Sequence, residues 1–156
     1  MPQTTAQKIT PFLWFDAEAE AAASHYTSIF ENSRITETSR AHDKVMSVTF
    51  ELSGQRFIAL NGGPHYQFSP AISLFVAVDS QPELDRIWDA LLSGGGKPTR
   101  CGWLVDRYGL SWQVIPSVLG KLMGDPDPGR SSRAVQAMMG MVKLDIAALE
   151  RAAAGD

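Results

Sequence analysis

The sequence predicts an α+β fold in which one βαβββ unit occurs twice and a helical tail follows. Two apolar strands, 9–16 and 72–79, match in register at Ile, Phe and a closing Asp, and each leads into an amphipathic helix and then shorter strands. Internal repeats of this kind mark duplicated supersecondary units. The whole chain, 1–156, is expected to form a single domain, with module one at about 8–62, module two at about 70–116 and the tail at about 117–153.

The elements of module one follow from helical spacing and strand alternation. Asp16 is the predicted N-cap of the first helix and Asn32 its end. The apolar stripe of this helix consists of Ala22, Ala23, Tyr26, Ile29 and Phe30. The predicted strands are 34–39, 45–52 and 56–61. In the second of these strands apolar and polar residues alternate, which is typical of a strand with one covered face, and Ser53-Gly54 is the predicted turn into the third.

Module two begins its helix with a capping box. Ser80 is followed three residues later by Glu83, and Pro82 lies in the first turn, where a missing N–H is tolerated. The apolar stripe of this helix consists of Leu84, Ile87, Trp88, Leu91 and Leu92. Gly94-Gly95-Gly96 ends the helix. Two weaker strands are predicted around 99–105 and 111–115.

The tail reads as short helices separated by a break. Residues 118–123 predict one helix, Asp125-Pro-Asp-Pro-Gly129 interrupts it, and Asp145 starts a last helix. Between them lies a Met-rich apolar stripe made of Ala134, Val135, Met138 and Met139. Because methionine adapts to irregular surfaces, the tail is expected either to pack across the sheets or a partner subunit, or to form core within one subunit.

Composition limits the class of protein. With 156 residues and 44% hydrophobic content the chain can bury a core without a staple, and the single Cys101 excludes an intrachain disulfide. A net charge of −3 with both signs interspersed argues against nucleic acid, and no run approaches the ~18 apolar residues of a membrane helix. The polar segment 1–9 lacks the apolar core of a signal peptide, so a cytoplasmic location is expected.

Several blocks together resemble a known family. They are 9–16, Ala59-Leu-Asn-Gly-Gly-Pro-His65, 101–116, 125–128 and 144–149. These blocks resemble the PhnB-like branch of the glyoxalase/bleomycin-resistance/dioxygenase (vicinal oxygen chelate) superfamily. The resemblance implies paired βαβββ modules that form a curled mixed sheet around a cavity, usually in a homodimer. The segment 40–44 is shorter than the Gly/Pro-rich loop usual in this branch, which would leave one cavity rim more open.

Members of this branch often carry the label 3-demethylubiquinone-9 3-methyltransferase. Binding S-adenosylmethionine in a doubly wound fold needs a Gly-rich turn that joins the end of a strand to a helix. Gly94-Gly95-Gly96 follows a helix, and Gly62-Gly63 is followed by Pro64 and a stretch without helical period. Both clusters are therefore predicted to be turns. Sequence motifs do not support the methyltransferase activity, and no cofactor is expected.

The resemblance also raises the question of a metal. Metal-dependent members of the superfamily place a His, Gln or Glu early in the first strand of each module and further carboxylates late in each module. Here the early positions are Ile9 and Ile72, the late position of module one is near Ala59, and only Gln113 could donate. Divalent ions need several O and N donors, so no metal site is predicted. No two of His25, His42 and His65 share a ligand spacing.

Strand alternation predicts which side chains face the implied cavity. If Phe12 and Trp14 pack under the first helix, Leu13 and Phe15 face the other side of the sheet, and Val76 likewise opposes Phe75. On the last strand Ser111, Gln113 and Ile115 would face the cavity. An apolar pocket with a few polar groups is the usual small-molecule site, although the same side chains could instead fill the space as core. The predicted ligand-binding residues are Gln113, Asn61, His65, Phe15, Leu13, Val76, Ser111, Cys101 and Trp103.

Two function classes remain after these arguments. The first is a metal-independent protein that binds a small, partly apolar molecule, as bleomycin-resistance proteins do. The second is an enzyme of unassigned reaction that uses Gln113, His65 or Cys101 without a metal. Cys101 could be a nucleophile or a small buried hydrophobe, and the loop from Asn61 to Tyr66 could clamp a ligand or be a simple turn. No carboxylate pair or nucleophile–base pair lies on the predicted cavity face, so binding is favoured.

Overall fold

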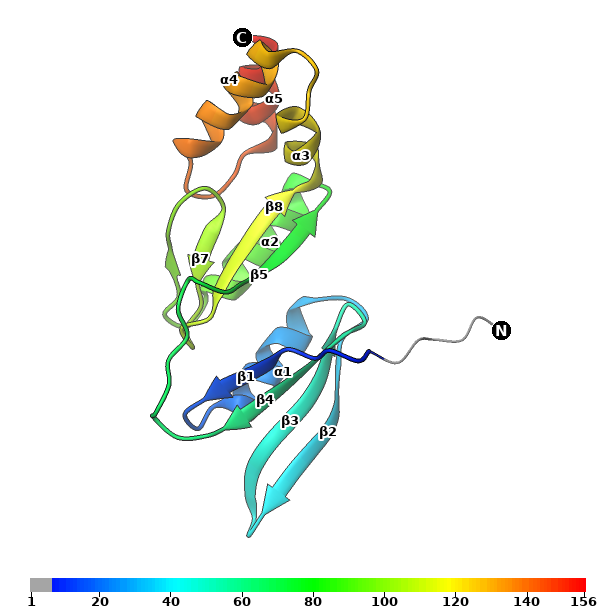
Figure 1. Cartoon of the computed structure of the whole chain (residues 1–156), viewed down its shortest axis with the longest axis vertical. Helices are drawn as coiled ribbons and strands as arrows, with labels where there is room; N and C mark the ends of the chain where they lie inside the picture. Colours follow the sequence, from blue (N-terminus) through cyan, green and yellow to red (C-terminus); the bar gives the residue numbers. More distant parts are fainter. Residues whose placement is uncertain (1–6) are drawn as a thin grey trace, which may run out of the picture. The chain divides into compact units, whose positions relative to one another are not determined.

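The computed structural model describes residues 7–156, and the chain divides into two compact units with the boundary between Gln67 and Phe68. Each unit contains one four-stranded mixed sheet and at least one helix (Figure 1). The predicted α+β class, the repeated βαβββ order and the helical tail are confirmed. Within residues 7–156 no helix is long and apolar enough to cross a membrane.

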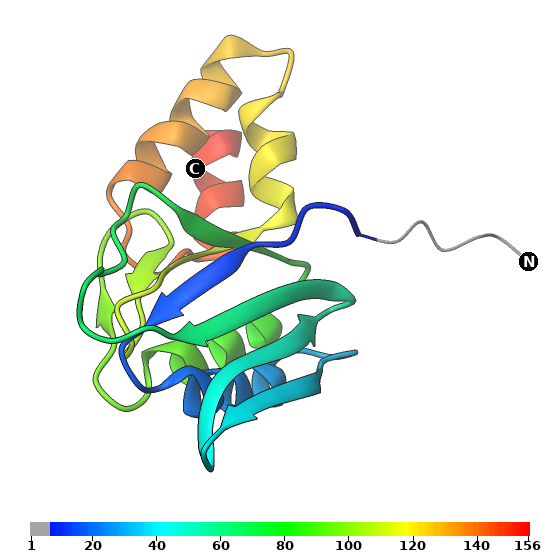
Figure 2. The same ribbon diagram turned by 60° about the horizontal axis from the view of Figure 1, so that its bottom comes forward.

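The first unit contains one helix and four strands. They are β1 (Phe12–Phe15), α1 (Ala19–Ile29), β2 (Arg34–Ala41), β3 (Lys44–Leu52) and β4 (Gln55–Asn61). The strand order is β1-β4-β3-β2, with β1 parallel to β4 and the other pairs antiparallel. Figure 2 shows the strong twist of the β2–β3 ribbon in cyan, and two register shifts interrupt the pairing of these strands. Bulges of this kind increase local twist and bend the strand.

Helix α1 covers one face of this sheet. Tyr26 is fully buried and its ring centroid lies 6.3 Å from that of Phe50, which itself stacks on Phe57 at 5.5 Å. Register places Leu13 opposite Ala59 on this same covered face. The predicted apolar stripe of α1 therefore faces the sheet, because its alanines, Tyr26 and Ile29 are all buried.

The predicted N-cap of α1 is wrong. The helix begins at Ala19 rather than after Asp16, and the residue before it, Glu18, makes no side-chain cap hydrogen bond. Instead the backbone N–H of Ala19 donates to Oδ1 of Asn61 at 2.8 Å. The acceptor that a helix N-terminus needs is supplied by the last residue of β4, so a local sequence pattern could not indicate it.

The second unit repeats this topology. Its elements are β5 (Ser73–Val78), α2 (Gln81–Leu92), β6 (Lys97–Pro98), β7 (Trp103–Val105) and β8 (Ser111–Pro116). The strand order is β5-β8-β7-β6, with β5 parallel to β8. The predicted capping box is confirmed, since Glu83 N donates to Ser80 Oγ at 3.3 Å and Asp79 N donates to Oε2 of Glu83 at 3.0 Å.

The turn between β7 and β8 is organised by a buried carboxylate. Asp106 is only 3% exposed, and its Oδ1 accepts from the backbone N–H groups of Tyr108 and Leu110 at 2.8 and 3.0 Å. Its Oδ2 accepts from Trp112 Nε1 at 2.9 Å. Gly109 has φ +88°, a left-handed conformation that glycine adopts readily. These bonds satisfy the carboxylate and tie the turn to a buried indole.

The tail adds three helices to the second unit. They are α3 (Ser117–Met123), α4 (Pro128–Met139) and α5 (Ile146–Ala154), which lie side by side in yellow, orange and red in Figure 2. Before α5, the carbonyls of Met141 and Val142 accept from Cys101 N and Gly102 N, both at 2.8 Å. Leu144 is fully buried, and its carbonyl accepts from the Gln81 side chain at 3.1 Å. Part of the tail is thus core of its own subunit.

Candidate functional site

The predicted facing of β1 and β5 is wrong. Leu13 and Phe15 are 4% and 3% exposed on the face that α1 covers, whereas Phe12 is 56% exposed on the opposite face. In the second unit Val76 is paired with the fully buried Val114 on the face covered by α2, and Phe75 is 61% exposed on the other. Both faces of β1 and β5 are apolar, so alternation could not decide which face a helix covers.

The uncovered face of the second sheet carries a row of three side chains, called here the central row: Phe75, Gln113 and Trp103. Gln113 lies on the central strand β8, directly opposite Phe75 of β5 on one side and Trp103 of β7 on the other. Residues opposite one another on adjacent strands share a face and lie within contact distance. The next row along the same strands consists of Ser73, Ser111 and Val105.

The amide of Gln113 is tied to its neighbouring row. Its Nε2 donates to Ser73 Oγ at 3.0 Å. Asn61, another predicted ligand-binding residue, makes its hydrogen bonds within the first unit. An amide group has two N–H donors and an acceptor oxygen, so this one bond leaves a donor and an acceptor of Gln113 for another molecule. Both side chains are half-buried, and Ser111 beside them is only 1% exposed.

The equivalent row in the first unit has different chemistry. Phe12 is opposite Ile58 on β4, and Ile58 is opposite Thr49 on β3. Each sheet thus has a phenylalanine at the corresponding position of its edge strand. Ile58 and Thr49 occupy the positions that Gln113 and Trp103 have in the second sheet. Only the second sheet has an amide at the centre of its uncovered face.

The loop after β4 packs on Trp14 of the first sheet. Trp14 Nε1 donates to the carbonyl of Gly63 at 2.9 Å, and the Tyr66 ring meets the indole edge-on with centroids 4.9 Å apart. A Cβ on Gly62 would lie 2.4 Å from the Trp14 ring, so only glycine permits this approach. His65 is exposed within this loop. The structure therefore gives the two glycines a packing role.

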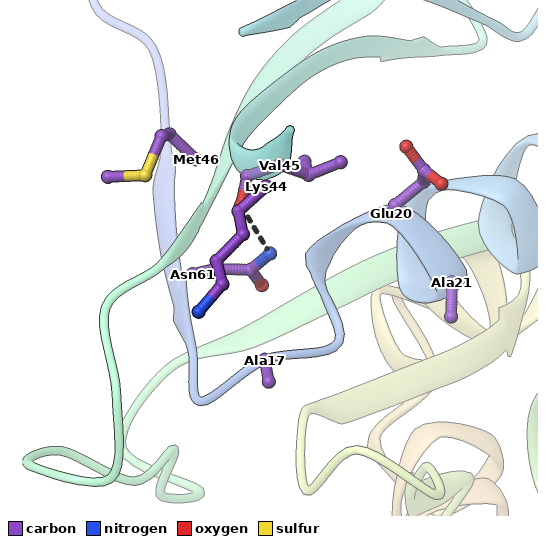
Figure 3. Close-up of a pocket in the computed structure, with 7 residues that line it drawn as sticks. All are labelled: Ala17, Glu20, Ala21, Lys44, Val45, Met46 and Asn61. Atoms are coloured by element: carbon purple, nitrogen blue, oxygen red, sulfur yellow. Dashed lines mark hydrogen bonds between the residues drawn. The ribbon is translucent and has the colours of Figure 1, made fainter. Parts of the chain in front are cut away.

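Asn61 lines a pocket at the start of α1. This open pocket has a volume of about 620 Å³ and lies between the β1–α1 turn and the beginning of β3 (Figure 3). Its lining residues are Ala17, Glu20, Ala21, Lys44, Val45, Met46 and Asn61. Asn61 accepts from Ala19 N and donates to the carbonyl of Val45 at 3.0 Å, so its amide holds the wall together. The Glu20 carboxylate pairs with Arg40 at 3.3 Å.

Cys101 is half-buried beside the tail. Its Sγ lies 3.9 Å from Sδ of Met139, and its backbone has φ +55°. Two hydrogen bonds hold the backbone in this strained conformation, one from Cys101 N to the carbonyl of Met141 and one from Gly102 N to the carbonyl of Val142. Gly102 lets Ile115 and Leu144 close over it, because a Cβ there would lie 2.8 Å and 3.1 Å from their methyl groups.

The donor atoms on the sheets do not fit a metal ion of the superfamily type. Ile9, Ala59 and Ile72 carry only alkyl side chains, and Gln113 alone offers an oxygen donor among the four positions. Across residues 7–156, no three side chains of His, Cys, Asp or Glu come together in a group that could hold an ion. A single amide cannot provide the several donors that a divalent ion requires.

The glycine clusters lie where turns were predicted. Gly94, Gly95 and Gly96 connect α2 to β6, and the first two have φ of +80° and +118°. Gly62 and Gly63 follow β4 and lead into the loop before β5. Neither cluster joins the end of a strand to the start of a helix. A Gly-rich turn that binds S-adenosylmethionine or a dinucleotide in a doubly wound fold needs that arrangement.

Sequence reasoning named Gln113, Ser111 and Trp103 but missed Ser73 and Phe75. These two residues precede the second helix in the duplicated strand, and Phe75 repeats Phe12 of the first copy. The sequence shows that repetition, but it does not show whether the two phenylalanines lie on the face that the helix covers or on the opposite face. The register with β8 supplies this information, because it places both residues beside Gln113 and Ser111.

Comparison with known proteins gives a consistent result. The family model described as 3-demethylubiquinone-9 3-methyltransferase matches residues 7–115. The PhnB protein of Bacillus cereus is 34% identical, with a TM-score of 0.67, over 71% of this chain and 100% of its own. The tail beyond residue 115 lies outside the family model. No curated protein matches the chain.

Two more distant structures share the fold alone. A protein of Pseudomonas aeruginosa has a TM-score of 0.59 at 22% identity, over 71% of this chain and 98% of its own. The fosfomycin resistance protein FosX of Listeria monocytogenes has a TM-score of 0.58 at 13% identity, over 77% of this chain and 98% of its own.

Proposed function

Because the chain belongs to the PhnB-like, 3-demethylubiquinone-9 3-methyltransferase family of the glyoxalase/bleomycin-resistance superfamily, we propose that it binds a small, partly apolar molecule without a metal ion. The observation that carries the proposal is Gln113, a neutral amide at the centre of an uncovered and otherwise mostly apolar sheet face. Few polar groups among apolar side chains are the usual composition of a small-molecule site. In this proposal the uncovered face forms one wall of an enclosing cavity.

Metal independence is supported by the chemistry of the side chains. The alkyl groups of Ile9, Ala59 and Ile72 cannot be ligands, whatever ion is offered. Purified protein is expected to contain no stoichiometric divalent ion, and a chelator is expected to leave its melting temperature unchanged. This part of the proposal would be contradicted if elemental analysis found about one Zn, Ni, Fe or Mn ion per chain and if removal of that ion unfolded the protein.

The methyl-transfer activity in the family description is not proposed for this chain. The two glycine clusters are turns in the wrong structural context for a methyl-donor site. The central row also lacks a carboxylate, a histidine or another strong base that could take a proton from a reacting hydroxyl or amine. Binding therefore accounts for the residues better than a reaction does.

We also propose that the protein is a cytoplasmic homodimer. Met139 is 53% exposed and Val142, three positions further along the tail, is 47% exposed. Apolar surface of this kind is commonly covered by a partner. Light scattering is expected to give twice the chain mass of 17.0 kDa. A monomer at micromolar concentration would argue against the dimer.

Native mass spectrometry of protein purified from its own cell tests the binding proposal. The expected result is a retained small molecule, released on unfolding. Its retention is expected to fall in Gln113→Ala, because one neutral hydrogen bond contributes about 0.5–1.5 kcal/mol. Thr49→Ala is the matched control, since Thr49 occupies the corresponding uncovered face of the first sheet. Equal loss in both variants, or no retained molecule from any preparation, would contradict the proposal.

A further inference from the structure

The central row has a shape that selects among small molecules. Phe75 and Trp103 stand on the two strands that flank Gln113, on the same face. Adjacent strands lie about 4.8 Å apart, so the backbones that carry the two aromatic side chains are roughly 9–10 Å from one another. Gln113 stands between them in the row, so a flat ring that lies over the Gln113 side chain can contact both aromatic groups, with carbon atoms about 3.5–4.0 Å apart.

The polar groups of the row restrict the ligand further. Gln113 donates one N–H to Ser73 at 3.0 Å, and this bond fixes the amide in place. When the N–H that points away from the carbonyl oxygen makes this bond, the remaining N–H donor and the acceptor oxygen lie side by side in one plane. A ligand group that offers an acceptor and a donor side by side, as a carboxamide or a lactam does, satisfies both at once.

The charge around the row argues for a neutral ligand. The residues of β5, β8 and β7 on the face away from α2 carry no ionisable side chain, and two of them, Ser111 and Ile115, are themselves buried. These residues are Ser73, Phe75, Ala77, Ser111, Gln113, Ile115, Trp103 and Val105. On the edge strand β6 of this sheet, Lys97 is opposite Val105, in the row next to the central row. A carboxylate placed on Gln113 would lose water without gaining a counter-ion.

Resting on the proposed function, we infer that the central row binds a flat, neutral aromatic ring that bears an adjacent donor and acceptor, of the carboxamide or lactam class. The amide of Gln113 pairs with that group, and Phe75 and Trp103 stack on the ring. Phe75 is 61% exposed, so a ring that covers it removes apolar surface from water. The first sheet, with Ile58 and Thr49 in the equivalent row, does not bind this class.

The test uses full-length, nitrogen-15-labelled protein and four fragments: benzamide, benzoate, toluene and cyclohexanecarboxamide. Two-dimensional NMR follows the side-chain amide of Gln113 and the indole N–H of Trp103 during titration. Benzamide is expected to shift both signals with the lowest dissociation constant of the four. The difference from toluene is expected to be at least about three- to ten-fold, which is the factor for one of the two hydrogen bonds at ordinary strength.

Two variants sharpen this experiment. Gln113→Leu keeps the size of the side chain and removes its amide, so the preference for benzamide over toluene is expected to disappear while Trp103 still responds. Phe75→Ala is expected to weaken both fragments, whereas Phe12→Ala, the matched change on the first sheet, leaves them unaffected. Equal binding of benzoate and benzamide, or a preference that survives Gln113→Leu, overturns the inference.

The outcome separates this inference from the binding proposal itself. If native mass spectrometry finds a retained molecule but no fragment shifts Gln113 or Trp103, the protein binds a ligand and the assigned class is wrong. If no molecule is retained and no fragment binds, both statements fail. Benzamide binding at the row supports both.

Discussion

The two sheets of this protein have the same strand order but differ at the centre of the uncovered face. Each begins with a strand parallel to its last strand, and each keeps a half-exposed phenylalanine at the edge, Phe12 in one and Phe75 in the other. The first sheet then presents Ile58 and Thr49, and the second presents Gln113 and Trp103. The two copies thus share their topology and the edge phenylalanine, while only the second has an amide at the centre of the row. This contrast is the reason that the proposed binding site is placed on the second sheet.

The largest expected effect concerns how the two copies turn their last hairpin. The first sheet uses the two-residue turn Ser53-Gly54, with φ of +50° and +83°, whereas the second uses the buried carboxylate of Asp106. Asp106→Ala would remove the carboxylate acceptor from the buried Leu110 N–H and Trp112 indole N–H and from the part-buried Tyr108 N–H. We expect it to lower the free energy of unfolding by about 3–5 kcal/mol, since each unsatisfied buried donor costs about 1–3 kcal/mol.

Urea unfolding followed by tryptophan fluorescence measures this effect. Asp106→Asn keeps one carbonyl oxygen and is expected to lose less stability than Asp106→Ala. Ser53→Gly in the first sheet is the control, and it is expected to change stability by less than about 1 kcal/mol because glycine adopts positive φ readily. Similar losses in the Asp106 and Ser53 variants would show that the two turns do not differ as described.

The second prediction concerns the loop after β4, which has no counterpart after β8, where α3 begins. Gly62→Ala would place a methyl group 2.4 Å from the ring of Trp14. The indole, its bond to Gly63 and its contact with Tyr66 would all have to shift. We expect a loss of about 1–3 kcal/mol, the usual cost of overpacking, measured by thermal unfolding.

Trp14 is also a spectroscopic probe for that change. It is the sole tryptophan of the first unit, and the other three lie in the second. Gly62→Ala measured in a background without the second-unit tryptophans is expected to alter the emission of Trp14 before unfolding. Unchanged emission together with unchanged stability would mean that the loop does not pack on the indole.

Much of the fold could be predicted from the sequence because it depends on local patterns. The capping box of Ser80 and Glu83 and the alternation in β3 are short-range signals, and the repeat is visible as two matching segments; each appears in the structure. The facing of Leu13, Phe15 and Val76 could not be predicted, because it depends on register between strands distant in sequence. Asn61 illustrates the same limit, since its partner Ala19 lies on a different element.

The third prediction compares the two helix starts. α1 relies on the Asn61 side chain from another strand, whereas α2 relies on its own Ser80. Asn61→Ala removes two hydrogen bonds, to Ala19 and Val45, and is expected to cost about 1–2 kcal/mol. Ser80→Ala removes one local cap and is expected to cost about 1 kcal/mol. Chemical denaturation of both variants checks the order, and a larger loss in Ser80→Ala would reverse the comparison.

The smallest expected effect concerns the ion pair that links the tail to α2, for which the first unit has no equivalent. Lys143 Nζ lies 2.9 Å from Oδ1 of Asp85, and this hydrogen bond, with a second from Gln81, lowers the pKa of Asp85 below its ordinary value. A lowered folded-state pKa stabilises the protein above the unfolded pKa, and this contribution is lost as the pH falls through the folded value.

Asp85→Asn is therefore expected to be slightly less stable than the parent at pH 7 and equally stable well below the ordinary aspartate pKa of about 3.9. The side chains of Lys143 and Asp85 are 40% and 42% exposed, so solvent screening limits the difference to roughly 0.2–1 kcal/mol. Melting temperatures between pH 3 and pH 7 measure it, and about 1 M salt should reduce it because exposed charges are screened. Glu37→Gln, which removes a carboxylate from β2 of the first sheet, is the control. It is expected to leave the pH dependence of the melting temperature unchanged. A difference that grows as the pH falls would mean that Asp85 does not stabilise the tail through its charge.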